Sequence, residues 1–294
     1  MVGDRGWRKA GLVALFLLPA LVPLVAFRIV PMLGSLWVSL QEWNLLRAPT
    51  FVGLDNYTGV LTDPIFHKGL LNTLYYLAGY LPLVLIFALV VALLLNSRLK
   101  GMALFRGAYF LPVVTSWVVV ALLWKWILSP QGGLVNYLLG LIGIDGPGWW
   151  TDPGWAMPSI IIASVWKDLG FNMLILLAGL QAIPEHLYEA ARIDGAGAWR
   201  RIRSITIPLL TPSILFVTVL TMIGSFQVFD QVYVMTEGGP AGATTVVMEQ
   251  VVKHAFRYGR MGTASAMSWV LFAIILVFTV AQLRFQRRWV HYAN

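Results

Sequence analysis

Six stretches of this chain are apolar over about 20 residues or more, and they constrain the fold more than any other feature. They lie at residues 10–40, 69–95, 103–128, 157–182, 207–235 and 262–285. A helix of about 20 apolar residues crosses the roughly 30 Å hydrocarbon core of a bilayer. We therefore expect an all-α integral membrane protein with six transmembrane helices.

The composition supports lipid as the solvent of this chain. Of its 294 residues, 59% are hydrophobic and only 12% are charged, and the mean hydropathy is +0.76, which does not fit an ordinary water-soluble domain. The first apolar stretch follows Arg5, Arg8 and Lys9, as a secretory signal would, but it continues past Arg28 to Leu40. It is too long for a cleaved signal, so we expect a retained helix.

Several classes of function find no support in the sequence. There is no cysteine, and the four histidines occur singly, without the spacing of a zinc motif. We expect no metal site and no catalytic residue. The net charge of +8 could indicate nucleic-acid binding, but lysine and arginine on the cytoplasmic side of a membrane explain it. We therefore expect no nucleic-acid partner.

Lysine and arginine also predict the orientation of the chain, because they are enriched in cytoplasmic loops. With the N-terminus inside, thirteen fall in cytoplasmic segments: Arg5, Arg8, Lys9, Arg98, Lys100, Arg106, Arg192, Arg200, Arg201, Arg203, Arg284, Arg287 and Arg288. Six fall in external segments: Arg47, Lys68, Lys125, Lys253, Arg257 and Arg260. This excess predicts that both termini lie in the cytoplasm.

The chain divides into three parts by composition. We expect residues 1–67 to form an N-terminal tail, the first transmembrane helix and an external segment, residues 68–285 to form the transmembrane domain, and residues 286–294 to form a cytoplasmic tail. The external segments 42–68 and 129–156 are rich in Trp, Pro, Gly and Asp. Glycine and proline break regular structure, and tryptophan suits the headgroup level, so these segments are expected to hold interfacial loops and short helices.

Residues 184–208 stand out because they are polar, small and placed between two apolar stretches. The run EHLYEAARI after Pro184 predicts a short helix with Glu185 and Glu189 in one acidic row. It ends at Asp194-Gly195, where glycine accepts a positive φ and turns the chain. An ordinary cytoplasmic loop explains the arginines that follow. The small residues around the two acids are better suited to close docking against another protein.

These residues resemble a known motif. Glu189-Ala190-Ala191, Gly195 three residues further on, and the run from Ile205 to Pro208 are similar to the EAA motif of membrane subunits of bacterial binding-protein-dependent ABC importers. The motif is usually written EAA, three residues, G, nine residues, I, one residue, LP, and Ile207 replaces its leucine here. The surrounding IPEHLYEAARIDGA, VYVMTEGGP and YGRMGTASAM resemble the carbohydrate-uptake branch, the maltose and glycerol-3-phosphate permeases.

The resemblance implies a type I ABC importer permease fold in the bacterial inner membrane, with residues 184–208, the EAA loop, as the contact with a cytoplasmic ATPase. The contact residues it implies are Glu185, Glu189, Ala190, Ala191, Asp194, Gly195 and Pro208. The implied partners are a second homologous permease, two ABC ATPase subunits and an extracytoplasmic sugar-binding protein. The sequence has no Gly-Lys pair and hence no phosphate-binding loop. We expect no cofactor on this chain, with ATP and magnesium bound by the partner ATPase.

Two stretches suggest a substrate pathway. WKDLGFN, 166–172, and SFQVFDQ, 225–231, interleave aromatic rings with amide or acid groups, the mixture that stacks on sugar faces and bonds sugar hydroxyls. By the resemblance, we expect Gly170, Asn172, Phe226 and Gln227 to contact substrate. Helix packing through amide hydrogen bonds is an equal alternative. Lys167 and Asp168 are adjacent, so they cannot face each other, and we expect them in a watery outer half of the helix.

The function predicted from these features is that of a permease subunit that moves a sugar, a polyol or a glycerol phosphate by alternating access, driven by a separate ATPase. An ion-coupled secondary transporter is the alternative, and it would need carboxylates at the membrane midplane and inverted repeats. A membrane-embedded enzyme would need clustered His, Asp or Glu at one depth. An exporter would not be expected to carry the EAA pattern.

Overall fold

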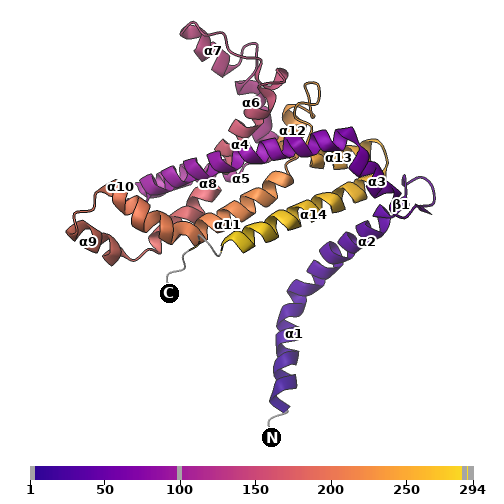
Figure 1. Ribbon diagram of the computed structural model, residues 1–294, viewed down its shortest axis with the longest axis horizontal. Coiled ribbons are helices and arrows are strands. Elements are labelled where there is room, and N and C mark those ends of the chain that lie inside the picture. The colour runs from indigo at the N-terminus through magenta and orange to yellow at the C-terminus, as the bar shows by residue number, and fades with distance from the viewer. Residues whose placement is uncertain (1–3, 98–100, 287–289, 291–294) are drawn as a thin grey trace. The chain divides into compact units, whose positions relative to one another are not determined.

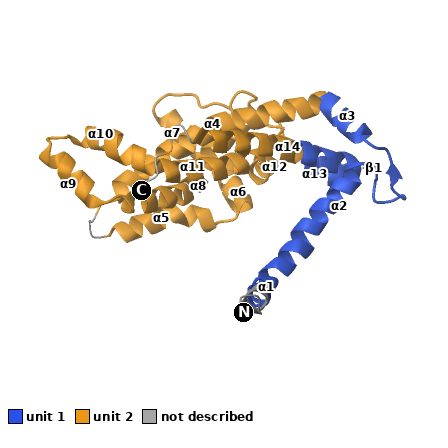
Figure 2. Cartoon of the chain, turned by 60° about the horizontal axis from the view of Figure 1, so that its bottom comes forward, with its two compact units in different colours: residues 1–63, 251–270 blue, residues 64–250, 271–294 orange. Residues whose placement is uncertain are grey.

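The computed structural model describes residues 4–97, 101–286 and 290 (Figure 1). Of the predicted tail 286–294, only residues 286 and 290 are therefore described, and Arg98, Lys100, Arg287 and Arg288 lie outside the described residues. The chain forms two compact units, one of residues 1–63 and 251–270, and one of residues 64–250 and 271–294 (Figure 2).

The second unit holds most of the helices. They are α4 (Pro64–Leu95), α5 (Met102–Val114), α6 (Trp117–Ile127), α7 (Leu134–Leu141), η2 (Trp149–Thr151), α8 (Ala156–Gln181), α9 (Glu185–Ile193), α10 (Ala198–Arg201), η3 (Ile202–Thr206), α11 (Ile207–Phe226) and α12 (Asp230–Met235). The chain then forms α13 (Val247–Val252), η4 (Lys253–Arg257) and α14 (Met261–Phe285); η4 belongs to the first unit, and α13 and α14 each have residues in both units.

Helix α8 is the centre of this unit, because it packs against α4, α5 and α11 and is the most buried of the candidate spans. Ala88 and Ala92 of α4 have no exposed surface and meet Met173, Leu176 and Leu210 in one cluster of buried side chains. Small residues at such a contact let two helix backbones approach closely, which is how helices associate in lipid.

The described residues contain five helices long and apolar enough to cross a membrane, or six if one bent pair counts as a span. This confirms the predicted six-span, all-helical architecture. The predicted third segment, 103–128, is wrong as a single straight helix, because α5 and α6 meet at 99°. Between them Thr115 has φ −78° and ψ 141° and Ser116 has φ −58° and ψ 140°, so neither residue is helical.

The predicted fifth segment, 207–235, is also interrupted. Helix α11 ends at Phe226, and α12 begins at Asp230, so residues 227–229 are not helical. Phe229 has φ −145° and ψ −62°, a conformation outside the helical region. The predicted segment extends across this break, although Gln227, Asp230 and Gln231 interrupt the apolar pattern there.

The first unit begins with a long apolar helical stretch, α1 (Asp4–Leu24), η1 (Val25–Ile29) and α2 (Val30–Ser39). A two-stranded hairpin of β1 (Gln41–Glu42) and β2 (Thr50–Phe51) follows, and then α3 (Asp55–Thr62). The hairpin departs from the all-helical expectation. It is held by Asn56 Nδ2, which donates to the carbonyls of Ser39 and Gln41, and by Met261 N–H, which donates to Trp43 O.

Candidate functional site

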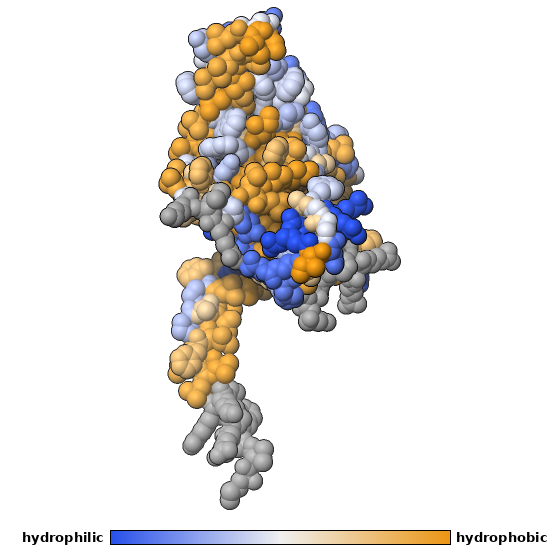
Figure 3. Space-filling model, turned by 90° about the vertical axis from the view of Figure 1, so that its left-hand side faces the viewer, coloured by the Kyte–Doolittle hydropathy of each residue, from blue (hydrophilic) through white to orange (hydrophobic). Residues whose placement is uncertain are grey.

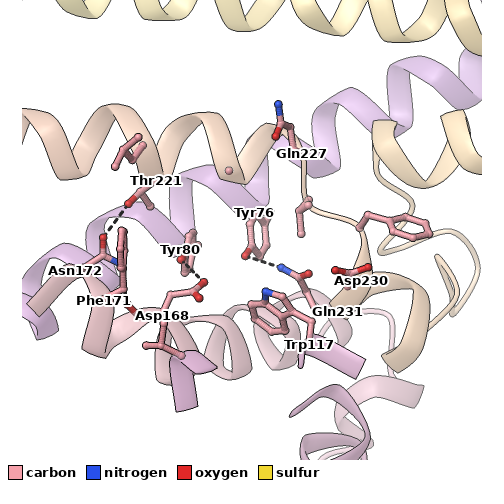
Figure 4. Close-up of a pocket in the computed structure, with 15 residues that line it drawn as sticks. Tyr76, Tyr80, Trp117, Asp168, Phe171, Asn172, Thr221, Gln227, Asp230 and Gln231 are labelled. Carbon is pink, nitrogen blue, oxygen red and sulfur yellow. Dashed lines mark hydrogen bonds between the residues drawn. The ribbon is translucent and has the colours of Figure 1, made fainter. Parts of the chain in front are cut away.

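A cavity of about 280 Å³, the α8 cavity, opens in the second unit beside α8 (Figure 4). Its lining comes from α4, the α5–α6 region, α8, the end of α11 and the start of α12. The lining residues are Tyr76, Tyr80, Val113, Trp117, Asp168, Phe171, Asn172, Leu220, Thr221, Gly224, Gln227, Val228, Phe229, Asp230 and Gln231. The cavity therefore combines aromatic rings with amides and acids, in the bend between α5 and α6 and at the break between α11 and α12.

Two tyrosines of α4 form one wall of the α8 cavity. Tyr76 and Tyr80 are four residues apart, so they lie on the same helix face, and their rings stack with centroids 5.2 Å apart. The hydroxyl of Tyr80 donates to Asp168 Oδ2 at 2.7 Å. The hydroxyl of Tyr76 accepts a hydrogen bond from Gln231 Nε2 at 3.2 Å. Figure 4 shows both bonds reaching from α4 to the polar side chains opposite.

The break after α11 brings Asp230 and Gln231 to the cavity. If residues 207–235 formed one continuous helix, successive side chains would turn by about 100° and only part of 227–231 could face one side. In the structure all five residues from Gln227 to Gln231 line the cavity. The non-helical turn therefore concentrates polar and aromatic groups at one place.

The structure brings two of the four predicted pathway residues to the α8 cavity, Asn172 and Gln227. Asn172 also packs, because its Nδ2 donates to the Asp168 carbonyl and its Oδ1 accepts from Thr221 Oγ1 at 3.3 Å. The side chain of Gln227 is exposed and has no hydrogen-bond partner among the described residues. Asn172 thus fits the alternative of helix packing through amide hydrogen bonds, and Gln227 is free of such packing bonds within the described residues.

Gly170 and Phe226 do not line the α8 cavity. A Cβ on Gly170 would overlap the backbone oxygen of Tyr109, so the absence of a side chain lets α5 pack on α8. Phe226 has no exposed surface, and its ring packs against Phe278 with centroids 5.2 Å apart. Both residues occupy packing positions in this structure, and their predicted contact with substrate stays a prediction.

Lys167 and Asp168 take different directions, as their adjacency predicts. Asp168 lines the cavity, but Lys167 is only 5% exposed, which differs from the watery position expected for it. The Nζ of Lys167 donates to Val113 O at 3.2 Å and lies 4.9 Å from the ring centroid of Trp117. The ammonium group of Lys167 thus interacts with a carbonyl oxygen and an aromatic face. Lys167 is not among the residues that line the cavity.

Sequence reasoning missed the tyrosines of the α8 cavity, together with Trp117. The signal for the tyrosines was their i, i+4 spacing within an otherwise apolar stretch, which puts two hydroxyls on one helix face. Asp230 and Gln231 lie inside the SFQVFDQ stretch that was singled out, although neither was chosen. Trp117 gave no signal, because its position depends on the bend between α5 and α6.

The EAA loop forms a helical hairpin that projects from one end of the second unit in Figures 1 and 2. Gly195 has φ +73°, as the sequence predicts. The N–H of Ala196 donates to Ala191 O at 2.8 Å, and the N–H of Gly195 donates to Arg192 O at 3.1 Å. This pair of bonds is a Schellman motif, which ends α9 and requires a left-handed residue at Gly195.

The tip of the EAA loop is open to contact. Of the predicted contact residues, the acids Glu185, Glu189 and Asp194 are exposed, as are Ala190 and Gly195. Two large apolar side chains are also exposed there, Ile193 at 87% and Trp199 at 73%. Figure 3 views this end of the chain, where hydrophilic residues gather beside apolar ones. Sequence reasoning missed Ile193 and Trp199 as surface groups.

The base of the EAA loop is fixed to the membrane-spanning helix that follows it. The hydroxyls of Tyr188 and Thr206 are 3.0 Å apart and share a hydrogen bond, which joins α9 to η3. Pro208 lies near the start of α11, which continues from α10 and η3 without a break. The Tyr188–Thr206 bond thus joins α9 to the helix that continues into α11. Ala191 is half-buried at this base.

The described residues contain no group of three His, Asp or Glu side chains that could hold a metal ion.

The matches to known proteins identify the family. A family model described as "Binding-protein-dependent transport system inner membrane component" matches residues 66–291. The chain belongs to this family. It is accordingly a transport subunit with several spans of the inner membrane, as the resemblance predicted. The matched range includes the predicted transmembrane domain, the α8 cavity and the EAA loop.

Individual relatives cover nearly the whole chain. The trehalose/maltose transport system permease protein MalF of Thermococcus litoralis is 38% identical over 96% of this chain and 95% of its own length. A solved bacterial ABC transporter involved in import of the acidic polysaccharide alginate has a TM-score of 0.84 at 27% identity, over 97% of this chain and 99% of that one. A bacterial alginate ABC transporter in complex with a pentasaccharide-bound periplasmic protein has a TM-score of 0.86 at 25% identity, over 99% of each chain.

Proposed function

We propose that this chain is one permease subunit of an ATP-driven importer that carries a saccharide, a polyol or a glycerol phosphate across the cytoplasmic membrane. Its family and the transport system named for its 38% identical relative support a sugar cargo. One structural observation carries the proposal: α8 and α11, which line the polar and aromatic α8 cavity, are also the two helices that the EAA loop joins.

The assembly in this proposal contains a second homologous permease, two cytoplasmic ATPases and an extracytoplasmic sugar-binding protein. The similar alginate transporter in complex with its periplasmic protein supports the last of these partners. ATP and magnesium bind to the ATPases, because this chain has no Gly-Lys pair and so no phosphate-binding loop. Both termini lie in the cytoplasm, which puts the EAA loop on the ATPase side.

The proposed mechanism is alternating access. The exposed tip of the EAA loop, with Glu185, Glu189, Ala190, Ile193 and Trp199, rests in a cleft of the ATPase. When ATP brings the two ATPases together, the loop moves with them, and the Tyr188–Thr206 bond passes the movement to α11. The end of α11 then shifts at the α8 cavity and changes the side from which the cargo can enter.

The alternative, an ion-coupled secondary transporter, gains no support from the family or from the relatives. Asp168 is a carboxylate inside a candidate span, which such a mechanism could use. Its hydrogen bond with Tyr80 and its position in the lining fit a sugar contact equally well. The energy source distinguishes the two mechanisms experimentally.

The experiment compares Gly195→Val with wild type in proteoliposomes that contain the complete transporter. Valine at φ +73° is strained, and its side chain would crowd the tip of the loop. We expect ATP-dependent uptake to fall at least tenfold, while the helices still insert, because nothing in lipid has changed. ATP hydrolysis should no longer respond to the loaded binding protein.

Gly143→Val is the matched control, because Gly143 has φ +74° and equally open surroundings but lies outside the EAA loop. It should keep coupled uptake. Wild-type uptake and ATPase response in Gly195→Val would contradict the coupling role. Uptake that ignores ATP and follows a proton or sodium gradient would instead support the secondary transporter.

A further inference from the structure

We propose that the α8 cavity selects uncharged saccharides over carboxylated, sulfonated or phosphorylated ones, and that Asp168 and Asp230 are the specificity-determining residues. This inference rests on the proposed function and narrows its cargo, because it removes glycerol phosphates and acidic sugars. The fold alone does not make this choice, since a solved transporter of the same fold is involved in the import of an acidic polysaccharide. The side chains that line the cavity of each transporter must therefore determine whether it accepts a neutral or an acidic cargo.

The charges of the lining have one sign. Two of the 15 lining residues carry carboxyl groups, Asp168 and Asp230, and none is Lys, Arg or His. An anionic sugar is normally held by arginine or lysine, which donate to its carboxylate or phosphate. In this cavity such a group would meet only acids and neutral side chains. Like charges that are brought together out of water repel strongly.

Lys167 does not supply the missing positive charge. It is the neighbour of Asp168 on α8, but its Nζ donates to Val113 O and lies over the Trp117 ring, and the residue is not part of the lining. Its charge offsets part of the field of Asp168. Asp230 forms no ion pair within the described part of the chain and is exposed at the cavity. Asp230 therefore carries most of the repulsion.

The same groups suit a neutral sugar. Carboxylates are acceptors, and sugar hydroxyls are donors, so each acid can bind a hydroxyl. The Asp168 carboxylate is held in place by the Tyr80 hydroxyl, as Figure 4 shows. Trp117 and Phe171 provide aromatic faces beside it, on which the apolar face of a pyranose ring can stack. The cavity thus rejects an anion with the groups that bind a neutral ring.

The test uses matched sugar pairs: trehalose with trehalose 6-phosphate, and methyl α-glucopyranoside with methyl α-glucopyranosiduronate. The members of each pair differ chiefly in the presence of an anionic group. Binding is measured by saturation-transfer NMR on the complete transporter in nanodiscs without the binding protein, so that the selectivity of the binding protein does not enter. Wild type should bind the neutral member of each pair at least tenfold more tightly.

Asp230→Asn and Asp168→Asn keep the shape of the side chain and remove the charge. We expect the preference for the neutral sugar to fall about tenfold in Asp230→Asn and less in Asp168→Asn, where Lys167 is close. Asp145→Asn removes the same charge from an exposed position outside the lining and is the control. It should keep the wild-type preference.

Equal binding of both members of each pair by wild type, or an unchanged preference in Asp230→Asn, would overturn the selectivity. Failure of the proposed function looks different. In that case ATP and the binding protein would drive no uptake of the neutral sugars into proteoliposomes, while selective binding in nanodiscs persisted.

Discussion

At the scale of single residues, neighbours in the sequence have separate tasks. Phe226 and Gln227 are adjacent at the end of α11, but Phe226 is completely buried against Phe278 and Gln227 is exposed at the α8 cavity. The helix ends between them, so the two side chains leave the backbone in different surroundings. A substitution at each position should therefore affect a different property of the transporter.

We predict that Gln227→Ala weakens sugar transport without affecting stability. The amide has no hydrogen-bond partner among the described residues, so its removal leaves no protein group unpaired. One lost hydrogen bond to cargo should cost about 1 kcal/mol, or a shift of about fivefold in the sugar concentration for half-maximal uptake. Phe226→Ala should instead lower the thermal midpoint of the purified transporter, because it empties a packed site.

Uptake kinetics and thermal unfolding of both variants, at matched subunit content, check this pair of predictions. A lowered thermal midpoint for Gln227→Ala, or unchanged kinetics in that variant, would return Gln227 to a packing role. An unchanged thermal midpoint for Phe226→Ala, with altered kinetics, would favour the contact with substrate that was expected for Phe226 from the sequence.

At the scale of helices, close contact between α5 and α8 depends on one position without a side chain. At Gly170 a Cβ would overlap the backbone oxygen of Tyr109 and approach Phe110 Cα at 2.9 Å. Backbone atoms cannot rotate away as a flexible side chain can. The glycine therefore fixes how closely the bent α5–α6 pair lies against α8, and with it the Trp117 wall of the α8 cavity.

We predict that Gly170→Ala lowers the thermal midpoint of the transporter and weakens uptake. Alanine normally favours a helix interior over glycine by about 1 kcal/mol, so a loss of stability would report the overlap and not helix propensity. Gly107→Ala is the matched control, since Gly107 is in α5 and its Cβ would meet nothing within 4 Å. This control should be neutral or slightly stabilising, and a neutral Gly170→Ala would contradict the packing role.

The helices show how far the sequence could predict this protein. Hydropathy located all six apolar segments, because each must be long enough to cross a bilayer, and local rules located the left-handed turn at Gly195. The breaks at Thr115–Ser116 and at residues 227–229 were not predicted. Both breaks lie inside segments that were predicted as single apolar stretches, although polar residues occur at each, Thr115 and Ser116 at one and Gln227, Asp230 and Gln231 at the other. Two of the four predicted pathway residues do not line the cavity, because Gly170 packs against α5 and Phe226 packs against Phe278.

At the scale of the whole subunit, the distance between cavity and loop is spanned by continuous helix. From Asp168 to Gln181, α8 rises about 20 Å at 1.5 Å per residue, and α9 begins after three intervening residues, at Glu185. On the other side, α11 runs from the EAA loop back to Phe226 beside the cavity. The helices α8 and α11 thus connect the proposed ATPase contact with the proposed cargo site, and residues 182–184 are the non-helical link between α8 and α9.

These helices can link the cargo site to a cytoplasmic ATPase only if the EAA loop lies in the cytoplasm. That orientation is predicted from the positions of lysine and arginine. The chain has no native cysteine, so single cysteines can report it. Thr151 lies in η2, which precedes α8, and Ser204 lies in η3, at the far end of the EAA loop that follows α8. Both residues are exposed. Neither residue lines the α8 cavity.

We predict that Thr151→Cys reacts with a membrane-impermeant maleimide in intact spheroplasts, whereas Ser204→Cys reacts only after the membrane is permeabilised. Thirteen basic residues in the predicted cytoplasmic segments against six outside should hold this orientation. Labelling of both variants in detergent is the control for reactivity, because both side chains are exposed. The reverse pattern would put the EAA loop outside the cell, away from any ATP-driven partner. It would contradict the orientation and the coupling role together.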